Sequence, residues 1–329
     1  CRRTSRPISC ATSACRPGTT VRASPSPHSG EPFKKERPMS RTTDIFLTAL
    51  APAIWGSTYL VTTEALPAGY PITLAALRAL PAGLLLLAVT HRLPDRAWIG
   101  RVFLLGSFNF ALFWVLLFVA AYRLPGGVAA TLGALQAMMV IGMARGWLGT
   151  PIRAGALAAA ATGALGVALL LIGPEARLDP IGIAAGLGGA ASMAAGTVLS
   201  HKWQPPVSAL TFTAWQLTAG GVILLPLALL VEPPLPPLSG ANLAGLAWLG
   251  LIGAATTYAI WFRGVARLEP GAVSMLGMMS PVTAVVLGWL WLGQSLSMVQ
   301  AIGAVIVLAS VWAGQRANRP ATSAPASPA

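Results

Sequence analysis

Arg78 is the residue whose type and position most strongly suggest chemistry, because it is the only formal charge well inside a long apolar run. A guanidinium in a low-dielectric interior requires compensation, which a carboxylate or phosphate on a solute would supply. The structural alternative is that Arg78 donates to carbonyls of neighbouring helices or extends to the aqueous interface. Arg78 is therefore the first candidate for a solute-binding residue.

Aromatic and uncharged polar side chains occupy the middle of several other apolar runs. Rings beside a few convergent polar groups suit an amphipathic solute, since the rings provide apolar contact and the polar groups fix its orientation. The alternative for each residue is a hydrogen bond within its own helix or, for tryptophan, a lipid-facing position. With Arg78, the predicted substrate-binding and translocation residues are Trp55, Ser57, Tyr59, Asn109, Trp114, Gln136, Ser192, Tyr258 and Ser280.

Side chains for covalent or metal chemistry are not placed inside the apolar runs. The three histidines lie in the N-terminal segment or at the ends of runs, and the three cysteines all precede residue 16. A hydrolase needs a nucleophile beside its base, and a metal site needs convergent ligands. We therefore expect no catalytic residues, no cofactor and no metal site, and an intramembrane enzyme is disfavoured.

Membrane helices are the elements expected to position these candidates. Hydrophobic residues make up 55% of the 329 residues, charged residues make up 9%, and the mean hydropathy is +0.69. A soluble domain of this size could not bury so much apolar surface, so a lipid bilayer is the expected surrounding. Ten runs long enough to cross a bilayer as helices span residues 44–65, 71–90, 99–121, 127–147, 153–173, 180–200, 207–231, 242–263, 270–292 and 298–314. We predict an all-α integral membrane protein with ten transmembrane helices.

The segments outside these runs are polar tails and short loops. Residues 1–41 contain nine Lys or Arg and two Glu, so this basic tail holds much of the net charge of +13. No basic face interleaved with aromatic residues occurs elsewhere, so nucleic acid is not an expected partner. Met39 resembles a natural start, and residues 1–38 are expected to be disordered or outside the translated protein. Residues 317–329 are expected to form a disordered C-terminal tail.

Basic residues in the short loops predict the orientation in the membrane. With the N-terminus in the cytoplasm, the outer loops contain only Arg123 and Arg177. The inner loops contain eight basic residues, which are Arg92, Arg96, Arg101, Arg145, Arg153, Lys202, Arg263 and Arg267. Both termini are therefore predicted to be cytoplasmic.

A weak internal repeat relates the two halves of the membrane region. Residues 123–149 resemble residues 267–293 without a gap; Arg123 is opposite Arg267, and both copies end in Trp-Leu-Gly. The offset of 144 residues spans five helices, an odd number, so the two copies must have opposite orientations. We predict two five-helix inverted-topology repeats, with substrate bound near the midplane between them.

The domain boundaries follow from this duplication. The first repeat is expected over residues 44–173 and the second over residues 180–314. Gln216 in AWQLTAGG is the counterpart of Arg78 in ALRALPAG, which suggests that the two residues share a structural position.

Several of these motifs resemble the EamA-type family of the drug/metabolite transporter superfamily. The resemblance covers about residues 44–314 and rests on APAIWGSTYLVTTEALP at 51–67, on Arg78 in its segment, on the paired Trp-Leu-Gly endings and on the small-residue fifth and tenth helices. Family members commonly have Glu after the Leu-Gly that ends the fourth and ninth helices. Thr150 and Gln294 stand there in this chain, so whatever that carboxylate contributes is missing.

The resemblance implies a central cavity and a carrier in the bacterial inner membrane that exports small metabolites, such as amino acids or amphipathic drug-like compounds, by alternating access. A uniporter or channel-like permease for neutral or anionic metabolites is the alternative. All nine Asp and Glu lie in tails, loops or helix ends, and Glu64 is the nearest to a membrane site. This distribution favours facilitated diffusion, exchange or coupling through the charge of the solute, because proton-coupled exporters usually have a carboxylate in their path.

Glycines on the fifth and tenth helices predict a close helix contact. Gly163, Gly166 and Gly303 permit backbones to approach, and tight packing within the chain is the simpler interpretation. A homodimer contact is the alternative use of the same surface.

Overall fold

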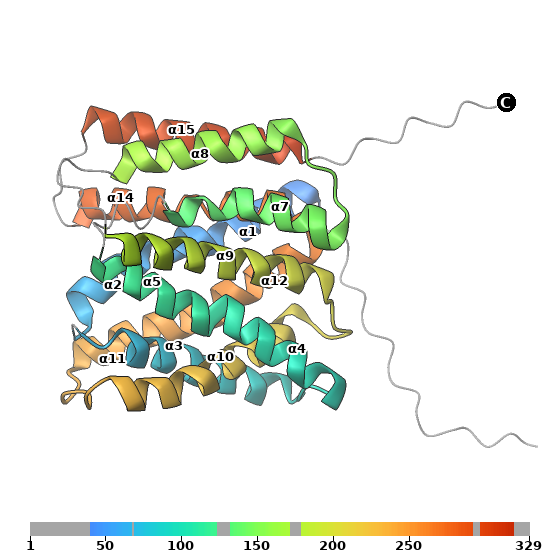
Figure 1. The fold of residues 1–329 in the computed structure, drawn as a ribbon. Helices are drawn as coiled ribbons and strands as arrows, with labels where there is room; N and C mark the ends of the chain where they lie inside the picture. The colour runs from blue at the N-terminus through green and yellow to red at the C-terminus, as the bar shows by residue number, and fades with distance from the viewer. Residues whose placement is uncertain (1–39, 68, 124–131, 172–178, 292–296, 319–329) are drawn as a thin grey trace, which may run out of the picture. The chain divides into compact units, whose positions relative to one another are not determined.

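The computed structural model describes residues 40–67, 69–123, 132–171, 179–291 and 297–318. Within these ranges the regular secondary structure is entirely helical (Figure 1). Among the described residues, eight helical segments are long and apolar enough to cross a membrane. Two shorter apolar helices, Leu132–Leu148 and Ala154–Leu169, adjoin segments outside the described ranges. These segments correspond to the ten predicted runs and confirm the all-α membrane architecture.

The first half contains the first five spans. The elements are α1 (Arg41–Trp55) and α2 (Ser57–Ala65) in the first span, α3 (Pro71–Thr90) in the second, α4 (Arg96–Gly106), η1 (Ser107–Ala111) and α5 (Leu112–Arg123) in the third, α7 (Gln136–Leu148) in the fourth and α8 (Ala154–Leu171) in the fifth.

The second half repeats this order. Its elements are α9 (Pro180–Lys202) in the sixth span, α10 (Ala209–Val231) in the seventh, α11 (Gly240–Ala247), η2 (Trp248–Thr256) and α12 (Thr257–Arg267) in the eighth, α13 (Pro270–Leu276) and α14 (Met279–Trp291) in the ninth, and α15 (Met298–Ala317) in the tenth.

Turn residues explain where these helices begin. Pro71, Pro180 and Pro270 each occupy a first helical position, where a missing N–H costs nothing. The hydroxyls of Ser208 and Ser297 accept N–H groups in the first turns of α10 and α15. The predicted breaks therefore coincide with local capping chemistry.

The two halves share their irregularities as well as their order. The third and eighth spans both contain a π-helical segment, and the offset of 144 residues places η1 opposite residues 251–255, within η2. The fourth span is interrupted at Leu135 and the ninth at Gly277 and Met278, next to Met279, which is the equivalent of Leu135 in the repeat. A repeat that conserves interruptions supports a duplicated scaffold more strongly than shared hydrophobicity does.

Helices with equivalent places in the two halves pack against each other. Figure 1 shows α8 beside α15 at one edge of the molecule and α3 with α10 at the opposite edge. A Cβ at Gly83 of α3 would stand 2.5 Å from the backbone nitrogen of Thr218 in α10, and a Cβ at Gly166 of α8 would stand 3.0 Å from the nitrogen of Val307 in α15. The small residues of the fifth and tenth spans are thus used for contact within the chain.

Helix ends define two ends of the bundle. At one end, which we call the basic end, Arg41 at the start of α1 donates to the carbonyl of Asn318, and Arg153 before α8 donates to that of Ala317. His201 at the end of α9 lies 2.6 Å from the carbonyl oxygen of Val265 in α12, and His201 and Arg267 line the same cavity as Arg41, so α9 and α12 also end there. The start of α9 and Arg123 consequently lie at the opposite end. Arg123 and Arg267 are on opposite ends of the molecule, as an inverted repeat requires.

Candidate functional site

Aromatic rings from both halves meet in the interior. The ring centroids of Trp55 in α1 and Tyr258 in α12 are 4.7 Å apart, and those of Trp55 and Trp261 are 5.2 Å apart. Phe110 in η1 lies 4.6 Å from Tyr258 and 5.4 Å from Trp114 in α5. We call these five residues the aromatic centre. It joins the first and third spans of the first half to the eighth span of the second half.

Arg78 of α3 borders the aromatic centre. Its guanidinium carbon lies 5.0 Å from the ring centroid of Trp114, a cation–π arrangement, and its Nη2 donates to the carbonyl of Gly253 at 2.7 Å. Its Nε is buried without a hydrogen-bond partner among the described residues. No carboxylate in the described part of the chain forms an ion pair with Arg78. Among the described residues, the groups in contact with this positive charge are the neutral Gly253 carbonyl and the Trp114 ring.

The carbonyl of Gly253 belongs to the π-helical segment η2, where the hydrogen-bond ladder changes register. Thr257 Oγ1 also donates to this carbonyl at 2.9 Å, and the indole nitrogen of Trp55 donates to the same hydroxyl at 2.8 Å. A chain of hydrogen bonds therefore runs from Trp55 through Thr257 and Gly253 to Arg78. Irregular π-helical turns are frequent at functional sites, and here one is bonded directly to the membrane-embedded charge.

The equivalent positions of the other half form a closed and neutral contact. Asn109 has the place of Gly253 in the repeat, and Gln216 has the place of Arg78. Asn109 Nδ2 donates to Gln216 Oε1 at 2.7 Å and to Ser200 Oγ at 3.2 Å, and all three side chains are fully buried. The same two positions thus hold an amide pair in one half, and an arginine with a bare backbone carbonyl in the other.

The structure brings together only some of the predicted site residues. Trp55, Arg78, Trp114 and Tyr258 converge at the aromatic centre. Asn109 belongs instead to the separate amide contact with Gln216.

The remaining candidates have local partners or lie apart. Ser192 donates to the carbonyl of Phe108, and Ser57 donates to that of Ile54. Gln136 and Ser280 are half-buried, and among the described residues no hydrogen bond links either one to the aromatic centre. The side chain of Tyr59 lies outside the described part of the structure.

Sequence reasoning did not identify Phe110, Gly253, Thr257 or Trp261 as parts of this arrangement. A usable signal is present, since Gly253, Thr257 and Trp261 recur at intervals of four along the eighth span and so share one helical face. The 144-residue offset also pairs Trp114 with Tyr258, and this equivalence could have marked both as residues near the junction of the halves.

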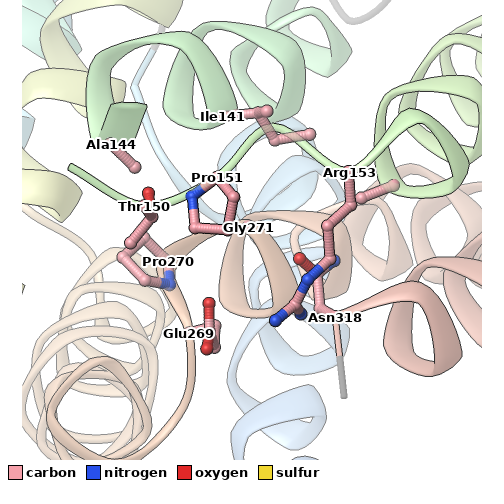
Figure 2. A pocket seen from close by; sticks show the side chains of 10 residues that line it. Ile141, Ala144, Thr150, Pro151, Arg153, Glu269, Pro270, Gly271 and Asn318 are labelled. Atoms are coloured by element: carbon pink, nitrogen blue, oxygen red, sulfur yellow. The ribbon is translucent and has the colours of Figure 1, made fainter. Parts of the chain in front are cut away.

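Two cavities lie at the basic end, whereas the rings of the aromatic centre pack closely against one another. One cavity of about 410 Å³ is lined by polar residues from several helix ends, which are Arg41, Asp44, Thr150, His201, Arg267 and Glu269. Figure 2 shows a neighbouring pocket of about 20 Å³, where Thr150 and Glu269 lie across from Arg153 and Asn318. Thr150, at the position where the resemblance implies Glu, lines both. Gln294 lies outside the described residues.

Comparisons with known proteins agree with this architecture. A profile of the EamA-like transporter family matches residues 42–172 and 180–313. Protein PecM of Dickeya dadantii is 43% identical over 263 residues, covering 79% of this chain and 88% of the relative. The uncharacterized inner membrane transporter YedA of Escherichia coli K12 is 30% identical, covering 77% of this chain and 85% of the relative.

More distant proteins also match the chain. A protein of Salmonella typhimurium named "Probable amino-acid metabolite efflux pump" is 25% identical and covers 83% of this chain and 95% of its own length. A crystal structure superposes with a TM-score of 0.73 at 19% identity, covering 85% of this chain and 98% of that chain. This last likeness concerns the fold alone.

Proposed function

The chain belongs to the EamA-like transporter family of multi-pass membrane proteins, and from that premise we propose that it is a bacterial inner-membrane secondary transporter. It exports small metabolites, such as amino acids or other amphipathic compounds, by alternating access of its two halves. The name of the Salmonella relative supports an amino-acid-like substrate. The chain acts as a carrier and not as an enzyme, and both of its termini face the cytoplasm.

The position of Arg78 is the observation that carries this proposal. A cation with no carboxylate partner in the described structure borders aromatic rings at the contact between the two inverted halves. Inverted-repeat transporters place their substrates at this level and junction. We assign Trp55, Arg78, Trp114 and Tyr258 to substrate contact. Asn109 and Ser192 support the neighbouring helices through their own hydrogen bonds.

A facilitator or uniporter is the second candidate, and the placement of the acids favours it. The described carboxylates lie at helix ends or loops, and none is bonded to the aromatic centre. Coupling by a proton through the centre therefore lacks its usual carboxylate. Flux measured with and without a pH gradient separates the two candidates, since a facilitator is indifferent to the gradient.

Two assays test the function. Metabolites released by cells with and without overexpression are compared, and solute flux is measured with the purified full chain reconstituted in proteoliposomes. Arg78→Ala and Trp55→Ala are expected to reduce flux at least about tenfold, the effect of roughly 1.4 kcal/mol of lost binding free energy. Trp289→Ala is the matched control, because Trp289 is 51% exposed on the surface of the helices. Unchanged flux in both site variants would overturn the assignment of the site.

A further inference from the structure

We propose that the substrate is an organic monoanion that carries an aromatic ring, with its carboxylate paired to Arg78 and its ring held by the aromatic centre. This inference rests on the proposed transport function and specifies its substrate class. It follows from the hydrogen-bond requirements of the guanidinium and from the side chains that surround it.

The guanidinium has unused capacity to bind an anion. A guanidinium offers five N–H donors, but Nη2 donates to one carbonyl and the buried Nε has no described acceptor. The carbonyl of Gly253 does not depend on Arg78, since Thr257 Oγ1 donates to it as well. Arg78 can therefore exchange this carbonyl for a carboxylate without leaving a buried acceptor unpaired.

The charge balance favours a single negative charge. A dianion such as a phosphate monoester needs a second cation, whereas the structure places the single guanidinium of Arg78 beside the rings of the aromatic centre. The Asn109 and Gln216 contact leaves Asn109 Oδ1 and Gln216 Nε2 buried without described partners, but both side chains are neutral and so supply no second positive charge. One carboxylate matches one guanidinium in bidentate geometry.

The surrounding rings favour an aromatic solute. Trp114 lies beside the guanidinium, and Trp55, Phe110 and Tyr258 surround the adjoining space with centroid distances of 4.6–5.4 Å. At such separations a planar ring can replace an existing ring contact by a small rotation of one side chain, since tilted and edge-to-face pairs are similarly favourable. An aliphatic chain of the same charge gains less there.

Four probes separate the contribution of the charge from that of the ring. Cinnamate is an aromatic monoanion, cinnamamide is a neutral analogue, cinnamylamine is a cationic analogue, and nonanoate is an anion without a ring that has as many heavy atoms as cinnamate. Binding to the purified full chain is measured by the shift of its thermal unfolding midpoint, and transport is measured in proteoliposomes.

Cinnamate is expected to bind at least about tenfold more tightly than the other three. Arg78→Gln should abolish the preference for cinnamate over cinnamamide, and Arg78→Lys should restore part of it if the variant protein folds. Equal binding of cinnamate and cinnamylamine, or an unchanged preference in Arg78→Gln, contradicts the substrate class. Transport of a neutral or cationic solute would contradict the class and leave the transporter function standing, whereas failure to move any metabolite would overturn that function.

A second, independent observation concerns ion pairs at the two ends of the molecule. At the basic end, Asp44 Oδ1 of α1 lies 2.9 Å from Arg263 Nη2 and 3.5 Å from Arg267 Nη1, both of α12. At the opposite end, Arg123 of α5 pairs with Asp179 before α9, with 3.0 Å between Nη1 and Oδ2.

These pairs are equivalent in the repeat. Arg123 and Arg267 occupy the same position in the two halves, and each acid stands at the beginning of the first span of the other half. Both pairs therefore connect the two halves, one at each end of the bundle. We infer that they are two latches that separate in turn during transport, the basic-end latch being Asp44 with Arg263 and Arg267, and the opposite-end latch being Asp179 with Arg123.

The latches differ in burial, and this difference sets which end opens more readily. The side chain of Asp44 is 9% exposed and has two arginine partners, whereas Arg123 and Asp179 are 44% and 32% exposed. Removing one partner of a buried pair is much more disruptive than removing one of an exposed pair. The end that contains Arg123 and Asp179 is therefore the one that opens more readily.

A cysteine in place of Thr257, which is fully buried beside the aromatic centre, reports the end from which the centre is reached. The full chain has its three N-terminal cysteines changed to serine, and a membrane-impermeant maleimide is applied to vesicles of either orientation. Asp44→Asn should raise labelling several-fold from the basic end alone, and Asp179→Asn should raise it from the opposite end alone.

The double charge reversal Arg123→Asp with Asp179→Arg should return labelling toward the starting level, which a purely structural effect of either single variant would not do. Equal changes from both sides, or no change in either variant, contradict the latch assignment.

Discussion

Two equivalent residue pairs at the junction of the halves differ in charge and in the size of their side chains. Arg78 faces the bare backbone of Gly253, whereas Gln216 faces the side chain of Asn109. The glycine matters here because a side chain at position 253 would stand between the guanidinium and any incoming group. A Cβ at Gly253 would lie 3.5 Å from Arg78 Nη2, an ordinary contact distance, so the site tolerates a methyl group and little more.

An amide side chain at position 253 should make the contact between Arg78 and residue 253 resemble the contact between Gln216 and Asn109. Gly253→Asn is expected to reduce transport at least about tenfold, a loss of roughly 1.4 kcal/mol, because the added amide would bond Arg78 as Asn109 bonds Gln216. Gly253→Ala is the matched control and should retain most of the flux. Initial rates in proteoliposomes with equal amounts of folded protein provide the measurement. Equal losses in both variants would indicate a backbone effect instead.

Asp179 has a charge that should persist in acid. Its hydrogen bond with Arg123 and the backbone N–H groups of Ile181 and Gly182 hold the pKa of this carboxyl below its usual range. A lowered pKa in the folded state means that its contribution to stability is present above the unfolded value of about 3.9 and is lost as pH falls through the folded value. Acidifying that side of the membrane from pH 7 to about 5 should leave the pair with Arg123 ionised.

Carbon-13 NMR of the Asp179 carboxyl measures this directly. Its titration midpoint should lie below about 3.9 and should rise in an Arg123→Gln variant. A midpoint above the usual aspartate range would show that the ion pair does not form in solution.

At the scale of elements, the spans were predictable because bilayer length and turn chemistry constrain them strongly. The predicted run 71–90 coincides with α3, and the predicted start of the sixth span at residue 180 coincides with the start of α9. Hydropathy does not detect a π-helical turn, since η1 and η2 are as apolar as the helices that flank them. The segments that shape the candidate site were for this reason not predicted.

The types of residue at the candidate site could be predicted from the sequence, but their arrangement in space could not. Mid-span polarity identified Arg78, Trp55 and Tyr258, but the rotation of each helix decides which of its faces meet, and one sequence does not specify that rotation. Asn109 was therefore grouped with Arg78 although it bonds Gln216. Phe110 was overlooked because an apolar ring resembles any other core residue until its neighbours are known.

Close helix contact at Gly83 gives a prediction at this scale. A Cβ there would lie 2.5 Å from the backbone nitrogen of Thr218, which cannot rotate away as a side chain could. Gly83→Ala should therefore lower the free energy of unfolding by about 1–3 kcal/mol. Gly100→Ala is the control, because nothing lies within 4 Å of a Cβ at Gly100, and it should be neutral or slightly stabilising. Unfolding midpoints in detergent compare the two variants, and equal midpoints would contradict the contact.

At the scale of the whole molecule, charge and duplication agree on a single arrangement. Arg41, Arg153 and Arg267 gather at the basic end through bonds to Asn318, Ala317 and Asp44, while Arg123 stands at the opposite end. Basic residues are retained on the cytoplasmic side during membrane insertion. The basic end is therefore the one expected to face the cytoplasm, and the cavity of about 410 Å³ lined by Arg41 and His201 would open toward that side.

The opposite placement of Arg123 and Arg267 yields the topological prediction. A phosphatase and a fluorescent protein, active only outside and inside respectively, are fused in turn after Leu124 and after Leu268. The phosphatase should be active after Leu124 and the fluorescent protein after Leu268, because the two sites follow equivalent arginines in halves of opposite orientation. Adding lysines beside Leu124 should weaken this pattern, since loop charge guides insertion. Activity of one reporter at both sites would mean parallel halves, and the ion pairs at the two ends could then not be equivalent.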